Sequence, residues 1–202
     1  DQLGRKYLSL ETDIESKSFG RHLLAAVWRA FKPGYPYDQI LILRGAQGVG
    51  KTTTIKTLAG ENNYISAVMV PKEKDLLLQL GQCWHYEMEE IDGHIASRHE
   101  GQLKALISRH TDNYRAPYGA TTEDHPRQCV LWGTTNESDL LVDQTGNRRY
   151  WIINITQHVD RDLLLRDRDM IWGTVMKAYR TGRTPILTKQ ERGQVAPIAE
   201  AS

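Results

Sequence analysis

The sequence has few cysteines and no long hydrophobic run, and both scarcities restrict what the protein is. No apolar stretch approaches the roughly 20 residues of a membrane span, and there is no signal-peptide pattern. We therefore expect a cytoplasmic protein without a membrane partner. The two cysteines, Cys83 and Cys129, lie in apolar segments and are expected as small buried residues in a reducing compartment, not as a disulfide. The seven histidines form no metal-ligand pattern, so no structural zinc is expected.

The chain also has almost no net charge. With 26 basic and 25 acidic side chains, its formal charge is +1, so any nucleic acid partner must meet a local basic surface. A hydrophobic content of 40% over 202 residues is enough for one domain with a core. The chain begins at Asp1 without a methionine, which suggests a domain cut from a longer protein.

A glycine-rich stretch at residues 45–52 is the most informative feature. It follows an apolar run and precedes a helix-compatible segment, 53–59, which matches the P-loop pattern G-x-x-x-x-G-K-[ST] with its expected flanks. Glycines let successive backbone N–H groups turn toward a phosphate, and the helix adds the positive end of its dipole. Lys51 would reach the β- and γ-phosphates, and the Thr52 hydroxyl would hold Mg²⁺. The expected nucleotide contacts are Gly45, Ala46, Gln47, Gly48, Val49, Gly50, Lys51, Thr52 and Thr53. An ordinary glycine-rich turn is the alternative, but the flanks favour a nucleoside triphosphate site.

Hydrophobic periodicity and turn residues predict the remaining elements. We expect strands at 40–43, 83–88, 128–132 and 150–155, extended pieces at 62–65 and 114–118, and helices at 21–31, 53–59, 71–80, 103–107 and 160–179. Strands that alternate with helices predict a parallel or mostly parallel three-layer α/β sheet. The expected organisation is a helical lead-in over 1–36, a P-loop core over 37–158, and a C-terminal helical segment and tail over 159–202.

Three glutamates, Glu87, Glu89 and Glu90, stand at the end of the expected strand 83–88. ATP hydrolysis needs one carboxylate for the Mg²⁺ shell and another to polarise the attacking water. A strand that ends in acids beside the P-loop strand would supply both. The alternative is the acidic first turn of a solvated helix, which glutamate also favours. The sequence leaves open which two of the three serve.

Two further segments carry polar residues suited to phosphate chemistry. Asn136 follows an apolar strand, where its amide can donate to a phosphate and accept from water; the alternative is the start of a turn. Arg148 and Arg149 stand between a turn and the last strand, which we expect to run beside the strand that ends at Asn136. A guanidinium held there suits an arginine finger on transition-state charge, whereas an exposed basic strand edge is the alternative.

In this order, these segments resemble the virulence-associated protein E family. Its members are phage- and plasmid-type replication ATPases related to superfamily 3 helicases within the AAA+ class. The matching positions are Arg29, Pro33, Gly34, the P-loop, Glu87, Glu90, Lys104, Asp112, Arg115, Pro117, Tyr118, Gly119, Arg127, the stretch 133–136 and the stretch 145–151. The most specific parts are Tyr-Arg-x-Pro-Tyr-Gly and Thr-Gly-Asn-Arg-Arg-Tyr-Trp, and the resemblance spans about residues 23–179.

The resemblance implies an AAA+ type P-loop NTPase that uses Mg-ATP and assembles as a hexamer. The implied roles are nucleotide and metal contacts for Lys51 and Thr52, a sensor for Asn136, and a pair of acids for Glu87 and Glu90, with Glu87 on the metal. Arg149 is preferred to Arg148 as the finger inserted into a neighbouring subunit, because it directly precedes the aromatic residue that starts the strand. Two features depart from the common pattern: Thr52 stands where serine is frequent, and the acidic cluster contains only glutamates.

The segment 112–128 is expected to form a hairpin between the acidic strand and the strand that ends at Asn136. Arg115, Tyr118 and Arg127 would supply phosphate contacts and a stacking face for single-stranded DNA, and Lys104 is a further expected contact. The resemblance implies that such a hairpin lines the central channel of a ring. The alternative is that Arg115 and Tyr118 only pack the hairpin against the body.

Two function classes follow. The favoured one is an ATP-hydrolysing DNA helicase or translocase domain of a phage- or plasmid-type replication protein. It acts as a homo-oligomeric ring on single-stranded DNA. A primase, fused to this chain or associated with it, is a possible further partner. The alternative is a P-loop ATPase that acts as a nucleotide-controlled switch or assembly factor without moving a strand.

Overall fold

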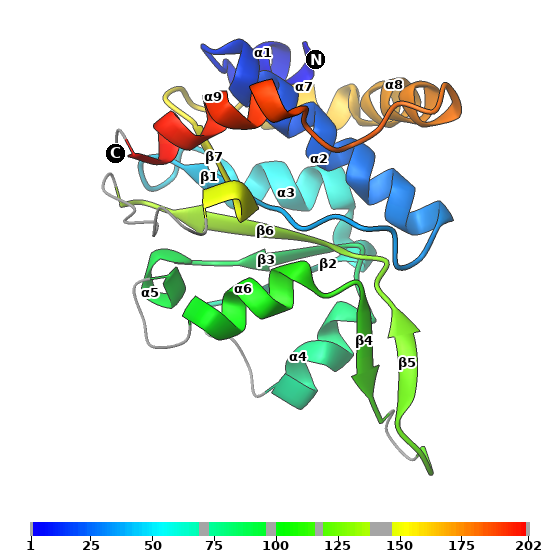
Figure 1. Ribbon diagram of the computed structural model, residues 1–202. Helices are drawn as coiled ribbons and strands as arrows, with labels where there is room; N and C mark the ends of the chain where they lie inside the picture. Colours follow the sequence, from blue (N-terminus) through cyan, green and yellow to red (C-terminus); the bar gives the residue numbers. More distant parts are fainter. Residues whose placement is uncertain (1, 69–72, 96–99, 116–118, 138–146, 201–202) are drawn as a thin grey trace.

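Five parallel strands form the centre of the molecule. The computed structural model describes residues 2–68, 73–95, 100–115, 119–137 and 147–200. The sheet contains β1 (Ile40–Arg44), β2 (Tyr64–Ala67), β3 (His85–Met88), β6 (Val130–Thr135) and β7 (Tyr150–Asn154), in the order β2-β3-β6-β1-β7. Each neighbouring pair is parallel. The structure thus confirms the expected α/β fold with a parallel central sheet flanked by helices (Figure 1).

Helices cover both faces of this sheet, and each face has its own hydrophobic core. One face carries α1 (Leu3–Leu8), α2 (Asp13–Phe31), α3 (Lys51–Ala59), α7 (Arg161–Arg166), α8 (Arg168–Arg180) and α9 (Lys189–Glu200), and the other carries α4 (Glu73–Leu80), α5 (Asp92–Ile95) and α6 (Glu100–Ser108). In β1, Leu41 and Leu43 enter the first core, while Ile40 and Ile42 enter the second, because successive side chains of a strand point to opposite faces. None of the helices formed by the described residues is both long and apolar enough to span a membrane.

A two-stranded antiparallel hairpin, β4 (Thr111–Tyr114) and β5 (Glu123–Pro126), projects away from the main sheet (Figure 1). It lies in the chain between β3 and β6, as the sequence predicted. Two short 3-10 turns, η1 (Glu61–Asn63) and η2 (Asn147–Arg149), lead into β2 and β7. Since β5 ends shortly before β6 begins, the hairpin leaves the body at the amino end of β6.

The strand order corrects two expectations. The acidic strand β3 does not lie beside β1, since β6 separates them, and β7 pairs with β1 instead of running beside β6. Strand order is a long-range property that neither periodicity nor turn residues encode. The order found here places the end of β6 between the glycine-rich loop after β1 and the acids after β3.

The helices also differ from expectation at their ends. α2 begins at Asp13, eight residues before the expected start, with a capping box in which Thr12 and Glu15 bind each other's backbone. Buried polar residues in its first turns, such as Ser16 and Ser18, hide the helical periodicity. The expected helix 160–179 is broken at Asp167 into α7 and α8, and the tail, which gave no signal, contains α9.

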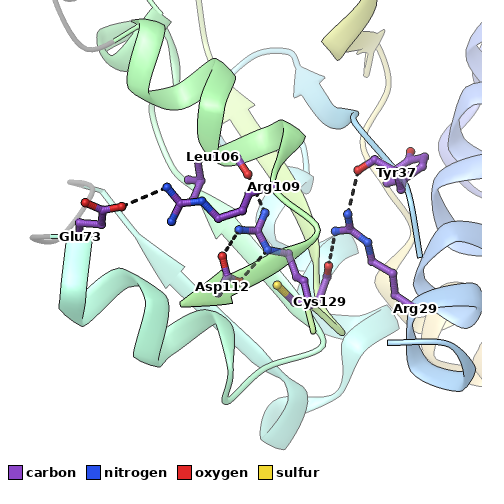
Figure 2. Close-up of polar contacts among 8 residues, drawn as sticks. Arg29, Tyr37, Glu73, Leu106, Arg109, Asp112 and Cys129 are labelled. Carbon is purple, nitrogen blue, oxygen red and sulfur yellow. Dashed lines mark hydrogen bonds and ion pairs between the residues drawn. The ribbon is translucent and has the colours of Figure 1, made fainter. Parts of the chain in front are cut away.

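A buried arginine ties the segment before β1 to the sheet. The Arg29 guanidinium donates to the backbone oxygens of Tyr35 at 3.2 Å, Tyr37 at 2.8 Å and Cys129 at 2.8 Å. Figure 2 shows the contacts with Tyr37 and Cys129. Burial lowers the pKa of Arg29 to about 10, so the side chain stays charged at neutral pH. Cys83 and Cys129 are both free and buried, as expected.

Candidate functional site

The glycine-rich loop, residues 45–50, connects the carboxyl end of β1 to the amino end of α3. Gly50 has a φ of 107°, a left-handed conformation that favours glycine. A Cβ atom on Gly45 would lie 2.4 Å from the backbone oxygen of Ile155, and one on Gly50 would lie 2.9 Å from the Cβ of Val159. The segment that follows β7 therefore packs directly under the loop and fixes its path.

Lys51 lies inside this loop with only 8% of its surface exposed. Its Nζ donates to the backbone oxygens of Gly45 at 2.6 Å and Ala46 at 2.9 Å, and to Oδ1 of Asn136 at 2.7 Å. Burial lowers the pKa of Lys51, and the nearby Glu87 opposes that shift. The structure thus brings together Lys51 and Asn136, which the sequence singled out 85 residues apart.

Glu87 is buried and accepts hydrogen bonds from three hydroxyl groups. Its Oε1 accepts from Thr52 at 2.7 Å and from Thr134 at 2.8 Å, and its Oε2 accepts from Tyr64 at 2.5 Å. Burial raises the pKa of Glu87, while these three donors oppose the rise by favouring the carboxylate. Glu87 and Thr52 therefore meet as the sequence predicted, inside a fixed set of donors.

A cavity of about 310 Å³ opens above the loop. Its lining residues are Gln47, Gly48, Gly50, Lys51, Thr52, Thr53, Glu89, Glu90, Thr134, Thr135 and Asn136. Glu89 is half-buried and Glu90 is exposed, with a φ of 51°. Glu89 and Glu90 line the cavity, whereas the buried Glu87 is linked to it through its hydrogen bond with Thr52.

The donor set around this cavity suits a nucleotide with Mg²⁺. Mg²⁺ prefers oxygen ligands, and proteins commonly bind it through one or two carboxylates together with substrate phosphates. Thr52 and Glu87 supply a hydroxyl and a carboxylate 2.7 Å apart. Backbone N–H groups at the amino end of α3 and the Lys51 ammonium suit the phosphates. Among the described residues, no three His, Cys, Asp or Glu side chains form a group that could hold a metal by themselves.

Two contributors to this site were not identified as such from the sequence. Tyr64 starts β2, whose alternation gives no indication that the phenol reaches Glu87. Thr134 lies one residue inside the strand that ends near Asn136, and its hydroxyl also binds Glu87. The sequence could have indicated only Thr134, because successive side chains of a strand alternate, which puts Thr134 on the same side as Asn136 just after the end of β6.

The two arginines lie far from this cavity. Arg148 and Arg149 form η2 at the amino end of β7, whereas the glycine-rich loop follows the carboxyl end of β1. The register pairs Ile40 with Tyr150, so one strand length, roughly 15 Å, separates the arginines from the loop of the same chain. Arg149 donates from Nε to Oγ of Ser108 at 2.8 Å, and Arg148 is exposed.

The expected nucleic acid contacts separate into different environments. Arg115 is exposed on the hairpin, where its Nε donates to the backbone oxygen of Gly119. Lys104 lies on α6 and pairs with Glu100 at 2.8 Å. Tyr118 lies outside the described residues.

Arg127 does not fit the expected phosphate contact. It is only 2% exposed, and its guanidinium forms a bidentate ion pair with Asp112 and donates to the backbone oxygen of Leu106 at 2.6 Å. Figure 2 shows Asp112 and Leu106 at the base of the hairpin. A buried arginine with these partners fixes the hairpin to α6, a packing role that the sequence offered only for Arg115 and Tyr118.

The fold and the site define an α/β protein with a glycine-rich loop at the carboxyl edge of a parallel sheet. The Virulence-associated protein E-like domain matches residues 1–202, so the chain belongs to this family. No curated protein matches the chain.

Solved structures share the fold. The chain resembles an apo structure of the NrS-1 C terminal region, with a TM-score of 0.61 and 16% identity, over 100% of this chain and 50% of that one. Two structures described as the A form apo structure of the same region give TM-scores of 0.56 and 0.55, with 15% and 14% identity, 92% and 90% of this chain, and 47% and 44% of those chains. The chain thus spans about half the length of the solved chains that it matches.

Proposed function

We propose that this chain is the ATP-hydrolysing, DNA-translocating domain of a phage- or plasmid-type replication protein, built on a P-loop of the AAA+ type. One observation carries the proposal: Lys51 and Thr52 at the start of α3 line one cavity together with Asn136, which follows β6, and Thr52 is hydrogen-bonded to Glu87 of β3. β6 lies between β1 and β3, so its end reaches both sides. Membership of the virulence-associated protein E-like family supports the link to replication.

The loop and Lys51 would bind the β- and γ-phosphates of ATP. The Lys51 side chain is largely buried, and it donates hydrogen bonds to uncharged oxygens, two backbone carbonyls and one amide. A phosphate is a stronger partner for a buried cation than a neutral oxygen, because the two groups carry opposite charges and attract each other more strongly in a partly buried site than in water. Release of Lys51 from the loop carbonyls to the phosphates is thus favourable.

Thr52 and Glu87 would hold Mg²⁺, which when bound neutralises charge that develops on the phosphates. Activation and orientation of the attacking water belong to other side chains that line the cavity. Glu90, with Glu89 beside it, takes a proton from the attacking water. Asn136 can orient that water and contact the γ-phosphate, since its amide both donates and accepts.

The position of Arg148 and Arg149 supports a homo-oligomer. These arginines lie at the opposite end of the sheet from their own loop, so an arginine finger at this position has to act on the site of a neighbouring copy. The family resemblance implies a hexamer. Single-stranded DNA is the proposed substrate of the hairpin, with Arg115 exposed on it, and a fused or associated primase is a further proposed partner.

The decisive measurement is ATP turnover with Mg²⁺ in the presence and absence of single-stranded DNA. We expect turnover that Lys51→Ala abolishes and that single-stranded DNA increases several-fold. Turnover that does not respond to DNA would instead support a nucleotide-controlled switch. Absence of turnover at any protein concentration, with correctly folded chain, would refute the ATPase.

A further inference from the structure

Four aromatic side chains form a cluster at the carboxyl ends of α2 and α8. Tyr179 packs edge-on against Trp28, with ring centroids 4.8 Å apart, and is stacked with Phe31 at 5.2 Å and an interplanar angle of 20°. Tyr35, in the turn after α2, lies 4.6 Å from Trp28. We call these four residues the α2–α8 aromatic cluster. Its position is fixed, because the Trp28 indole also donates to the backbone oxygen of Arg183 at 2.9 Å.

This cluster lies at the surface and is not part of the buried core. Phe31 is 59% exposed although one of its faces is stacked on Tyr179, and the other three rings are partly exposed. Among the described residues, no other large hydrophobic side chain is as exposed as Phe31. Packing within the chain does not explain why one face of the Phe31 ring stays in water, since burial of that face would lower the free energy.

The surface around the cluster is basic. Neither the segment 16–37 nor the segment 170–190 contains an aspartate or glutamate. Together they bring four cations to the ends of α2 and α8, namely Lys32, Lys177, Arg180 and Arg183. The Lys32 ammonium lies 4.8 Å from the centre of a Trp28 ring. The acids that directly follow these segments both have partners: Asp38 lies 2.5 Å from Nε2 of His110, and Glu191 pairs with Lys17 at 3.5 Å. In a chain with a net charge of +1, this local excess of positive charge favours an anionic ligand.

The aromatic cluster lies beside the base of the hairpin. Gly34, in the turn between Phe31 and Tyr35, donates from its backbone N–H to the backbone oxygen of Arg127 at 2.9 Å. Figure 1 shows the ends of α2 and α8 on the side of the molecule where β4 and β5 leave the sheet. A single strand of nucleic acid that contacts the hairpin could therefore continue onto the aromatic cluster.

We propose that the α2–α8 aromatic cluster binds single-stranded nucleic acid, with Phe31 as a stacking platform for a base and Lys32 and Arg180 as phosphate contacts. Aromatic faces with flanking cations are the combination that binds single strands with little sequence preference. A site for an apolar protein segment would gain nothing from the cations. The inference rests on the proposed single-strand binding and names a second contact surface for the same ligand.

The first test is fluorescence anisotropy with a labelled oligothymidylate at several salt concentrations. Phe31→Ala should weaken binding roughly 5- to 100-fold, the loss expected for one stacked base. Arg180→Ala should reduce the slope of log affinity against log salt by about 0.7, the loss of one phosphate contact on a single strand. Leu165→Ala, which removes a similarly exposed apolar side chain on α7, and Lys74→Ala, on α4 across the sheet, should bind as the wild type does.

Photocross-linking identifies the contact directly. Oligonucleotides that carry 5-iododeoxyuridine should cross-link to Phe31, Tyr35 or Tyr179, located by mass spectrometry of the digested chain. Cross-links confined to the hairpin, together with wild-type affinity of Phe31→Ala, would overturn the inference and leave the ATPase proposal intact. Loss of self-association in Phe31→Ala, with unchanged DNA affinity, would assign the cluster to a protein interface and also overturn it. Cluster-dependent DNA binding by a chain without ATP turnover would support the inference and refute the ATPase.

Discussion

The phenol hydroxyl of Tyr64 donates a 2.5 Å hydrogen bond to Oε2 of the buried Glu87. The other carboxylate oxygen is taken by the hydroxyls of Thr52 and Thr134, so Glu87 has donors on both sides. Without such donors, burial would favour the protonated acid, which cannot hold a metal ion. Tyr64 thus belongs to the set that orients the proposed metal ligand, without facing the cavity itself.

Tyr64→Phe should raise the Mg²⁺ concentration needed for nucleotide binding by roughly 10- to 100-fold, the usual effect of losing a residue that orients a metal ligand. Glu87 already has a raised pKa, and loss of a donor raises it further, so the acid limb of the pH–rate profile should move to higher pH. A fluorescent nucleotide titrated with Mg²⁺ measures the first effect. Tyr86→Phe is the matched control, because Tyr86 precedes Glu87 on the same strand but its hydroxyl binds Gln79. Equal Mg²⁺ dependence in the two variants would remove Tyr64 from the site.

Glu90→Gln should keep nucleotide binding and lower turnover by about 10² to 10⁴-fold, the usual contribution of a general base. The amide retains the size of the side chain but cannot accept the proton. Glu89→Gln is the matched control, because Glu89 lines the same cavity one residue away. Single-turnover hydrolysis with radiolabelled ATP distinguishes the two. Full activity in Glu90→Gln with loss in Glu89→Gln would exchange their roles.

Arg149→Ala should reduce turnover by about 10³ to 10⁵-fold, as expected for an arginine finger. A mixture of Arg149→Ala with Lys51→Ala should recover part of the activity, since some interfaces combine an intact loop with an intact finger. Turnover should also rise more than linearly with protein concentration. The controls are Arg149→Ala alone and Lys51→Ala alone, each at the same total concentration as the mixture. A mixture that stays inactive, although mixed assembly is demonstrated, would show that Arg149 does not act across subunits.

Acid should destabilise this fold through two buried histidines. His22 and His85 flank Trp132, and within the described part of the chain neither Nε2 atom has a hydrogen-bond partner. Burial lowers the pKa of both, in the case of His85 to about 3. Unfolded histidine titrates near 6.5, so below that pH the unfolded chain binds protons that the folded chain refuses. Their contribution to stability is complete above pH 6.5 and is lost as the pH falls toward 3.

The expected loss is about 1.4 kcal/mol per pH unit for each histidine. Urea unfolding of the wild type at pH 7.5, 6.5 and 5.5 measures it. His85→Gln should roughly halve the slope between pH 6.5 and 5.5, because the glutamine oxygen can still accept from Trp132 but does not titrate. His158→Gln, at an exposed position, is the control and should leave the slope unchanged. A wild-type stability that is flat over this range would contradict the assignment.

Local patterns in the sequence were sufficient for the loop and its flanks. Residues 45–50 form the expected turn between β1 and α3, because glycine conformation and the flanking strand and helix patterns act over a few residues. The sequence also contains a local indication of where α2 begins. Thr12 and Glu15 have the spacing of a capping box, which marks the true start of α2.

Burial of charged residues could not be read from the same patterns. Arg127 has the composition and position of a hairpin phosphate contact, yet it is inside the protein with Asp112, 15 residues away. An isolated arginine cannot be buried at acceptable cost, and its partner is chosen by the hairpin pairing and not by spacing along the chain.

The sequence by itself determined the glycine-rich loop and the Lys51 and Thr52 side chains that follow it, since these features depend on residues that are close together in the chain. Only the tertiary structure decided which residues meet one another across the sheet. β6 inserts between β1 and β3, and this places Asn136 against Lys51 and brings Thr134 to Glu87. The parallel pairing of β7 with β1 leaves Arg149, at the amino end of β7, at the opposite edge of the sheet from the loop. The physical reason is that parallel strands are joined by helical crossovers, which fix neither the order of the strands nor their register until both faces of the sheet are packed.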